Sequence, residues 1–137
     1  MVVLAIDSGT HKCGLAVVSI EKGVLYKEVV AFEELAQRSS AILKNFQVDK
    51  LVLGDRTNSK KVAEILNSSG VAAKGGGIIF VDEDASTLEG RRRYFQVNKR
   101  KGLWRLIPIG LQIPPVPYDD YVAVVLAERY FRLLSSL

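Results

Sequence analysis

Acidic residues stand at three places in this chain where an apolar strand is expected to end or a helix to begin. Asp7 closes the first apolar run, Glu83 lies in an acidic triplet after a later run, and Asp119 and Asp120 precede a helix-like stretch. Carboxylates gathered at the ends of buried strands repel one another and lose solvation. Divalent cations would offset this repulsion, and they prefer carboxylate oxygens as ligands. The pattern therefore predicts a metal-dependent enzyme that acts on phosphodiesters.

The spacing along the last helix separates its two aspartates. Asp119 precedes Val122 by three residues and Leu126 by seven, so it shares their apolar face and should point toward the sheet. Asp120 belongs to a neighbouring face and is the second candidate. Both stand at the helix start, where the backbone dipole favours an anion by ~0.3–1 kcal/mol. An Asp-Asp helix cap is the structural alternative.

Convergence of the acids is the central hypothesis. Two full charges about 4 Å apart repel by ~4 kcal/mol at an effective dielectric near 20. Three such carboxylates are tolerable in one pocket only if metal ions occupy it. Two Mg²⁺ ions (or Mn²⁺) would activate a water and stabilise the leaving 3′-oxygen in an in-line displacement.

A basic, aromatic segment suits a nucleic-acid partner. The net charge is only +4, but the stretch 91–105 holds a cluster of cations without an acid. Interleaved cations and aromatics fit a phosphate backbone and unstacked bases. The alternative is a solvated helix face followed by a basic loop. The residues of this segment are Arg91, Arg92, Arg93, Lys99, Arg100, Lys101 and Arg105, with Tyr94, Phe95 and Trp104.

Two turns offer further phosphate contacts. In the stretch 7–10 the Ser8 and Thr10 hydroxyls and a glycine backbone precede Lys12, whose point charge suits a phosphate. A tight turn between strands uses the same residue types. In the stretch 54–59, backbone amides and Arg56 could meet a phosphate at a helix start, or form a polar turn and cap.

Apolar periodicity predicts an α/β fold built on a five-stranded mixed sheet. The first three strands are joined too tightly for crossover helices and should form an antiparallel meander, and two parallel strands should follow it. Sites in such sheets form beyond the carboxyl ends of the strands. We expect strands at 2–6, 13–19, 23–30, 51–53 and 78–81, helices at 32–46, 59–67, 86–97 (capped by Ser86 or Thr87) and 121–134, and a long loop at 98–118.

Length and composition predict a single domain over 1–137 in the cytoplasm. The 48% hydrophobic and 25% charged content is ordinary for a globular protein. No apolar run approaches the ~20 residues that span a bilayer. The single cysteine, Cys13, excludes an internal disulfide framework and is expected in the core.

Three short motifs, in order, carry a resemblance to a known family. They are Asp7-Ser-Gly9 with Gly14-Leu-Ala16, the stretch Asp82-Glu83-Asp84-Ala85-Ser86-Thr87, and an aspartate at 119 that opens a small-apolar helix to Phe131. Together they resemble the YqgF family, RuvC-like nucleases of the ribonuclease H superfamily. The resemblance covers nearly the whole chain.

The resemblance implies a ribonuclease H-like fold and cleavage of structured nucleic acid. The reaction would be processing of the 16S ribosomal RNA precursor or resolution of four-way DNA junctions, and resolvases of this type work as dimers. Asp7, Glu83 and Asp119 would hold the metals, and Asp120 would assist or substitute. Lys12, Arg91–Arg93 and Arg105 would hold the phosphate backbone, with Trp104 or Tyr94 stacked on a base.

The chain departs from that family at two motifs and in one insert. Gly54-Asp55-Arg56 stands where the family has Gly-Leu-Pro, and Asp84 stands where it has arginine. The basic, proline-rich stretch 99–118 looks like that of a divergent branch. These departures bear on substrate more than on fold.

Three other functions compete with the nuclease hypothesis. An actin-like ATPase shares the phosphate motif at 7–10 but needs two duplicated domains. A non-catalytic nucleic-acid-binding module of the same fold would bind identically with or without Mg²⁺. A purely structural protein leaves the carboxylates unexplained.

Overall fold

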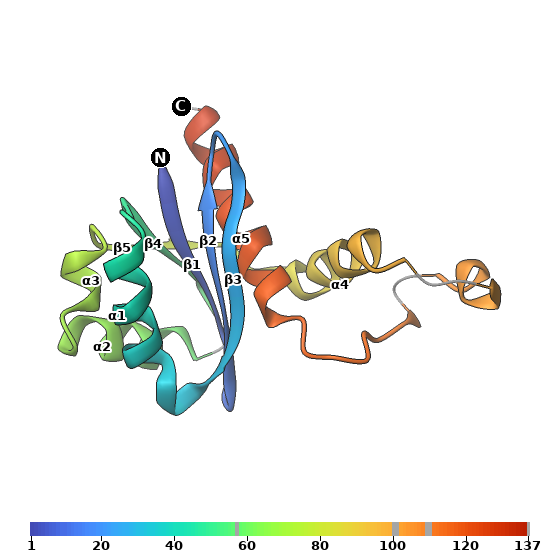
Figure 1. The fold of residues 1–137 in the computed structure, drawn as a ribbon, viewed down its shortest axis with the longest axis horizontal. Coiled ribbons are helices and arrows are strands. Elements are labelled where there is room, and N and C mark those ends of the chain that lie inside the picture. The colour runs from blue at the N-terminus through green and yellow to red at the C-terminus, as the bar shows by residue number, and fades with distance from the viewer. Residues whose placement is uncertain (57, 100–101, 109–110, 137) are drawn as a thin grey trace.

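The structure is a computed structural model that describes residues 1–137 apart from residues 57, 100–101, 109–110 and 137 and the side chain of Trp104. Three strands come first along the chain, and helices with two further strands follow them (Figure 1). Their bounds are β1 (Val2–Ser8), β2 (Lys12–Ser19), β3 (Gly23–Ala31), η1 (Phe32–Glu34), α1 (Leu35–Asn45), β4 (Lys50–Gly54), α2 (Ser59–Ser68), α3 (Val71–Lys74), β5 (Ile78–Val81), α4 (Ser86–Val97), η2 (Gly102–Leu106) and α5 (Asp119–Ser135).

The strands form one mixed sheet in the order β3-β2-β1-β4-β5. β1–β2 and β2–β3 pair antiparallel, whereas β1–β4 and β4–β5 pair parallel. In the centre, Ala5 of β1 lies between Ala16 of β2 and Val52 of β4. The prediction of an antiparallel meander followed by two parallel strands is confirmed.

The period of two in β1 divides the core into two layers. Leu4 and Ile6 face a cluster completed by α1, α2 and α3. Val3 and Ala5 face the other cluster, which α5 covers with its small apolar residues. Figure 1 shows α1–α3 on one side of the sheet and α5 on the other. Because both faces are covered, the central strands read as continuous apolar runs.

α4 and the residues after it form an arm, which we define as residues 86–118 as far as the structure describes them. α4 extends away from the sheet, and the chain then returns to the start of α5 (Figure 1). α4 packs closely on α5 at Gly90. A Cβ at this position would come too near the backbone of Val122. Close helix packing at its base therefore anchors the arm.

Several local features differ from the sequence predictions. The helix predicted at 32–46 begins with the 3₁₀ turn η1, and its α-helical part is only Leu35–Asn45. The single turn α3 was not predicted, because its four residues are too few to show a helical period. It is closed by the hydrogen bond from the Gly75 N–H to the Val71 carbonyl. The long loop contains the 3₁₀ turn η2. The last helix begins earlier than Tyr121, at Asp119, because the amides of Tyr121 and Val122 both donate to the Tyr118 carbonyl.

Cys13 is fully buried in the core, as predicted. In the part of the chain that the structure describes, none of the helices combines the length and the apolar character that crossing a bilayer requires.

Candidate active site

Asp7 lies at the carboxyl end of β1, in the middle of the sheet. It pairs with Gly14 of β2, and the preceding Ile6 pairs with Leu53 of β4. The side chain of Asp7 is half-buried, and the next residue, Ser8, is buried. The central strand therefore delivers a carboxylate into a confined position at the sheet edge.

Asp119 reaches the same position from the first turn of α5. A Cβ at position 14 would overlap the backbone carbonyl of Asp119, so only glycine allows the start of α5 to touch β2 here. The side chain of Asp119 forms a hydrogen bond with that of Asp7. Gly14 thus sets the distance between the two aspartates.

Glu83 follows β5 and lies against Gly54 at the end of β4. A Cβ on Gly54 would overlap the Glu83 carboxylate, so this glycine makes room for it. The Glu83 N–H donates to Oδ1 of Asp55 at 3.3 Å. The parallel pairing of β4 and β5 therefore places Glu83 beside the end of β1.

The three acids line one pocket of about 340 Å³. The rest of its wall comes from Ser8, Gly9, Arg56, a fourth acid Asp84, Ala85, and Ser86 and Thr87 at the start of α4. The structure therefore brings together carboxylates that lie far apart in the sequence, while their role as metal ligands stays a prediction. Among the described residues, no three His, Cys, Asp or Glu side chains are already placed to hold one metal ion.

The environment of Asp7 changes its proton affinity. Burial, followed by the negative charges of Asp119 and Glu83 and the hydrogen bond with Asp119, raises the pKa of Asp7 to about 7. Like charges that share a desolvated site cannot all ionise. Without a cation the Asp7–Asp119 pair therefore retains a proton near neutral pH.

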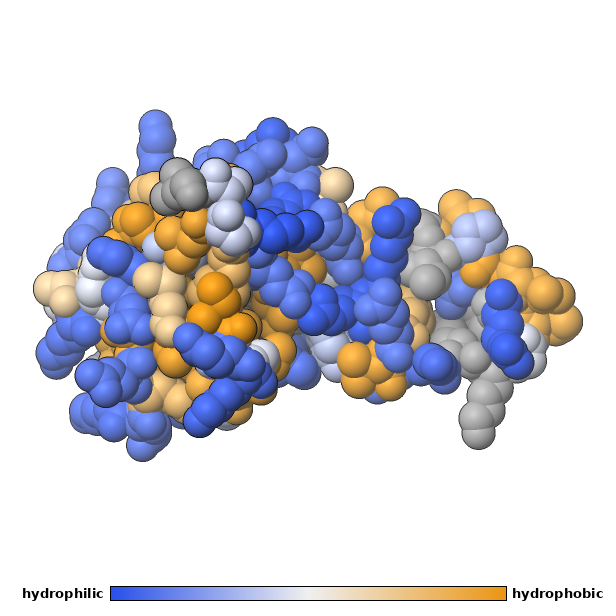
Figure 2. All heavy atoms as spheres, turned by 90° about the horizontal axis from the view of Figure 1, so that it is seen from above, coloured by the Kyte–Doolittle hydropathy of each residue, from blue (hydrophilic) through white to orange (hydrophobic). Residues whose placement is uncertain are grey.

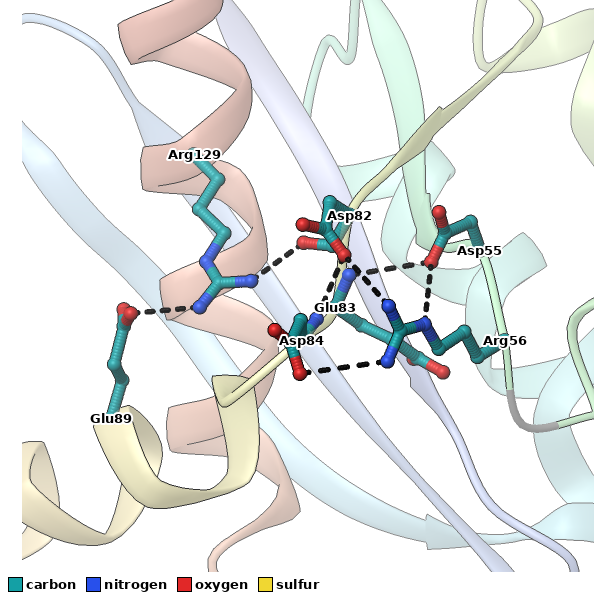
Figure 3. A network of polar contacts seen from close by, with 7 residues as sticks. All are labelled: Asp55, Arg56, Asp82, Glu83, Asp84, Glu89 and Arg129. Carbon is teal, nitrogen blue, oxygen red and sulfur yellow. Dashed lines mark hydrogen bonds and ion pairs between the residues drawn. The ribbon is translucent and has the colours of Figure 1, made fainter.

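Two arginines hold the turn that carries Glu83 (Figure 3). Arg56 lies 3.9, 3.6 and 3.5 Å from the carboxylates of Asp55, Asp82 and Asp84. From α5, Arg129 donates to the Asp82 carbonyl at 2.6 Å and to Glu89 of α4 at 2.7 Å. The two arginines therefore contact the turn from opposite sides (Figure 3).

Sequence reasoning missed Arg129. Its only signal is its position seven residues after Val122, on the buried stripe of α5. A cation on such a stripe needs a partner at the sheet edge, and the side chain of Arg129 is only 15% exposed.

The helix cap of α4 also differs from the prediction. The N-cap is Ala85, which has no side-chain cap hydrogen bond, and not Ser86 or Thr87. Ala85 adopts a left-handed backbone with φ 57°. That conformation is unfavourable for a residue with a Cβ and tends to be kept at functional sites. It turns the chain so that the first turn of α4 faces the pocket.

Asp120 is placed differently from its neighbour. Its Oδ2 accepts from the Lys27 ammonium at 3.0 Å, and the carboxylate is largely buried. It is not among the residues that line the pocket of Asp7, Glu83 and Asp119. The structure gives Asp120 a tertiary ion pair between α5 and β3.

The predicted nucleic-acid contacts fall into two groups. Arg91 donates to the Tyr118 hydroxyl at 3.2 Å, and Arg93 makes a double hydrogen bond to Glu128 at 2.7 Å. These two serve the packing of the arm. The exposed members are Lys12, Arg56, Arg92, Lys99 and Arg105. Arg100, Lys101 and the side chain of Trp104 lie outside the described residues.

Comparison with solved structures identifies the fold. RuvC of Thermus thermophilus in complex with a Holliday junction substrate matches with a TM-score of 0.59 and 21% identity, over 97% of this chain and 96% of that one. The fowlpox virus resolvase in complex with Holliday junction DNA matches with a TM-score of 0.61 and 11% identity, over 98% and 99%. The fold is therefore ribonuclease H-like, in the form shared by these resolvases.

Comparisons of the sequence found no match. No family model matches the chain, and no curated protein matches it. The specific resemblance to the YqgF family is accordingly without support beyond the motifs themselves.

Proposed function

We propose that this protein is a divalent-metal-dependent nuclease that cleaves phosphodiester bonds in branched nucleic acid. The observation that carries the proposal is the pocket in which Asp7, Glu83 and Asp119 meet at the end of the central strand. A carboxyl pair that retains a proton is an unfavourable arrangement for a purely structural site. On a ribonuclease H-like fold it is the expected resting state of a cation site.

The residues of the pocket fit a divalent cation. The donors are carboxylate oxygens, which Mg²⁺ and Mn²⁺ prefer. The Ser8 hydroxyl is buried in the same wall and has no hydrogen-bond partner within the described part of the chain. A hydrated cation supplies such a partner through its water.

The chain's own groups have separable tasks in the reaction. A bound divalent cation would supply Lewis-acid activation of the phosphodiester and its attacking water. Asp7 and Asp119 would hold such a cation as two ionised carboxylates, with the proton of the pair released to solvent. Glu83 completes the ligand set from the turn fixed by Arg56 and Arg129. The first turn of α4 lines the pocket, where the start of a helix would favour a phosphate oxygen.

Asp119, rather than Asp120, is the ligand that we assign on α5. Asp119 shares a hydrogen bond with Asp7, whereas Asp120 is bound to Lys27. Asp120 acts in this proposal as a positioning residue that fixes the first turn of α5 against β3.

Branched DNA is the substrate that we favour. Thermus thermophilus RuvC and the fowlpox virus resolvase were both solved with Holliday junctions. The exposed cations of this chain suit a phosphate backbone. Structured RNA, such as a ribosomal RNA precursor, is the alternative within the same reaction class.

The test compares cleavage of a four-way DNA junction, a 16S ribosomal RNA precursor and a linear duplex, with and without Mg²⁺. We expect Mg²⁺-dependent cleavage of the junction and a loss of at least about 100-fold in Asp7→Asn. Asp49→Asn is the matched control, because Asp49 accepts the Val2 N–H at 2.8 Å and an amide oxygen can replace it.

Two results would overturn the proposal. Equal cleavage by Asp7→Asn and the parent would remove Asp7 from the reaction. Binding of the junction with no cleavage in any divalent cation would identify a non-catalytic nucleic-acid-binding module.

A further inference from the structure

A second pocket adjoins the first on the side of the arm. It has a volume of about 330 Å³ and shares Asp7, Thr87 and Asp119 with the pocket described above. Its outer wall is the proline-rich segment 113–118, and Lys12 also lines it. A ligand held at the carboxylates therefore has direct access to this second space.

The outer wall is apolar and rigid. Ile113 and Val116 expose 70% and 52% of their surface. Proline rings at 114, 115 and 117 restrict the backbone, so little conformational entropy remains to be lost on binding. Tyr118 is fixed by the hydrogen bond from Arg91, whose guanidinium lies 5.8 Å from the ring centroid. The wall presents a preformed apolar surface beside a charged site.

Charge identifies the kind of ligand that fits. The stretch 90–118 contains cations and no acid, and Lys12 adds an exposed ammonium at the pocket. Two copies of the arm would repel each other, and an apolar peptide would leave the cations without partners. A ligand with an apolar flat face and a negative backbone satisfies both features, and an unpaired nucleotide has both.

We propose that this pocket is a nucleotide subsite: it takes one unpaired nucleotide next to the phosphate that is cleaved. The base lies against Ile113 and Val116, and the adjoining phosphate lies at Lys12. The inference rests on the proposed nuclease function and adds a requirement to it. The substrate must present, or give up to the protein, an unstacked base beside the carboxylates.

The rest of the arm has the same character. Leu103 and Leu106, in the 3₁₀ turn at its far part, are each 80% exposed. Figure 2 shows hydrophobic and hydrophilic side chains side by side over the projecting arm. Apolar side chains that enter between base steps unstack them, at a cost that extra contacts offset. The described part of the arm thus offers further apolar and charged side chains to bases and backbone.

The subsite predicts a selectivity that the carboxylate pocket alone would not give. Unstacking is least costly where a base is already unpaired. Branch points with an unpaired nucleotide should therefore be cut faster than fully paired junctions. The expected ratio is at least about tenfold, because unstacking and unpairing a base costs a few kcal/mol.

The experiment places the fluorescent base 2-aminopurine at each position flanking the branch point of a four-way junction. Ca²⁺ replaces Mg²⁺ so that binding is measured without cleavage. We expect the fluorescence at one position to rise severalfold when the parent protein binds, because unstacking relieves quenching. Val116→Ser should reduce the rise and the tenfold preference. Val24→Ser is the matched control, since Val24 is an exposed valine (44%) on β3 that does not line the proposed subsite.

The outcomes separate the subsite from the nuclease function. If no position becomes unstacked, or if both serine variants behave alike while Asp7-dependent cleavage persists, the subsite is wrong and the nuclease function stands. If the parent does not cleave but unstacks a base that Val116→Ser does not, the nuclease function is wrong and the subsite is right. The protein is then a non-catalytic module that binds an unstacked nucleotide. If Val116→Ser changes the oligomeric state in sedimentation and not the fluorescence, the groove is an interface between copies and the subsite is wrong.

Discussion

Asp7 of the central strand and Asp119 of the last helix, near opposite ends of the chain, share a hydrogen bond between their carboxyl groups. Such a bond requires a proton on one of the two. Burial and the neighbouring negative charges supply the reason, because they raise the pKa of Asp7 to about 7. The pair therefore links the stability of the fold to pH and to cations.

The first prediction concerns stability without metal. The pKa of Asp7 in the folded protein lies above its ordinary value of 3.8, so between pH about 4 and 7 the folded state binds more protons than the unfolded one. The stabilisation is present below that window and is lost as pH rises through it. The side chain of Asp7→Asn stays neutral. The free energy of unfolding of this variant should therefore exceed that of the parent by about 1–4 kcal/mol between pH 4.5 and 8.5.

Urea unfolding at several pH values in the presence of a chelator measures this gain. Asp49→Asn provides the control for replacing a carboxylate by an amide elsewhere. A difference between Asp7→Asn and the parent that stays constant across the range would contradict the raised proton affinity.

The second prediction reverses the first by adding a cation. A ligand that binds only the folded state stabilises it by about 2.7 kcal/mol at 100 times its dissociation constant. Mg²⁺ or Mn²⁺ at pH 8 should therefore raise the melting temperature of the parent by several degrees. Asp7→Asn and Asp119→Asn should respond much less. Equal shifts in parent and variants, measured by calorimetry, would place the cation elsewhere.

The third prediction tests whether Arg129 positions Glu83. Its guanidinium bonds to the Asp82 carbonyl, directly before Glu83. Loss of a hydrogen bond from a charged group costs about 1.5–3 kcal/mol. Arg129→Ala should lower kcat by about tenfold or more with little change in junction binding, and Arg129→Lys should restore part of it.

Arg132→Ala is the control for Arg129, because Arg132 is an exposed arginine one turn further along α5. A merely structural role would lower stability without a split between kcat and KM. Unfolding measured on the same variants shows which case holds.

The sheet could be predicted from the sequence because its signals are local and strong. Apolar runs with short connections gave the meander, and the strand at Ile78–Val81 was predicted with its observed bounds. Which residues of β1 face which layer was not predicted, because its run 2–6 is apolar throughout and shows no alternation. What the pattern could not supply were short or strained elements, such as α3 and the left-handed Ala85, whose geometry depends on tertiary packing.

The candidate site shows the same division. The positions of Asp7 and Glu83 followed from strand ends, which always gather at one edge of a parallel arrangement. The roles of Gly14 and Gly54 did not, because a close approach between distant segments leaves no periodic trace. Arg56 and Arg129 likewise act through residues far away in sequence, and neither pairing was predicted.

The fourth prediction ranks the two aspartates that sequence alone left open. Asp119→Asn should lower junction cleavage by at least about 100-fold and leave folding nearly intact, since it replaces a cation ligand by an isosteric amide. Asp120→Asn removes the partner of Lys27 in an ion pair whose aspartate is 12% exposed and whose lysine is 32% exposed. The variant should therefore lose about 1–2 kcal/mol of stability and keep cleavage within about threefold.

A double variant makes the ranking decisive. If Asp120 acts through Lys27, then Lys27→Met combined with Asp120→Asn should cost less stability than the sum of the single changes, because no charge is left without its partner. Cleavage measured on the same proteins completes the comparison. Should Asp120→Asn abolish cleavage in a fully folded protein while Asp119→Asn cleaves normally, the ligand on α5 would be Asp120, and the pairing of Asp7 with Asp119 would be structural only.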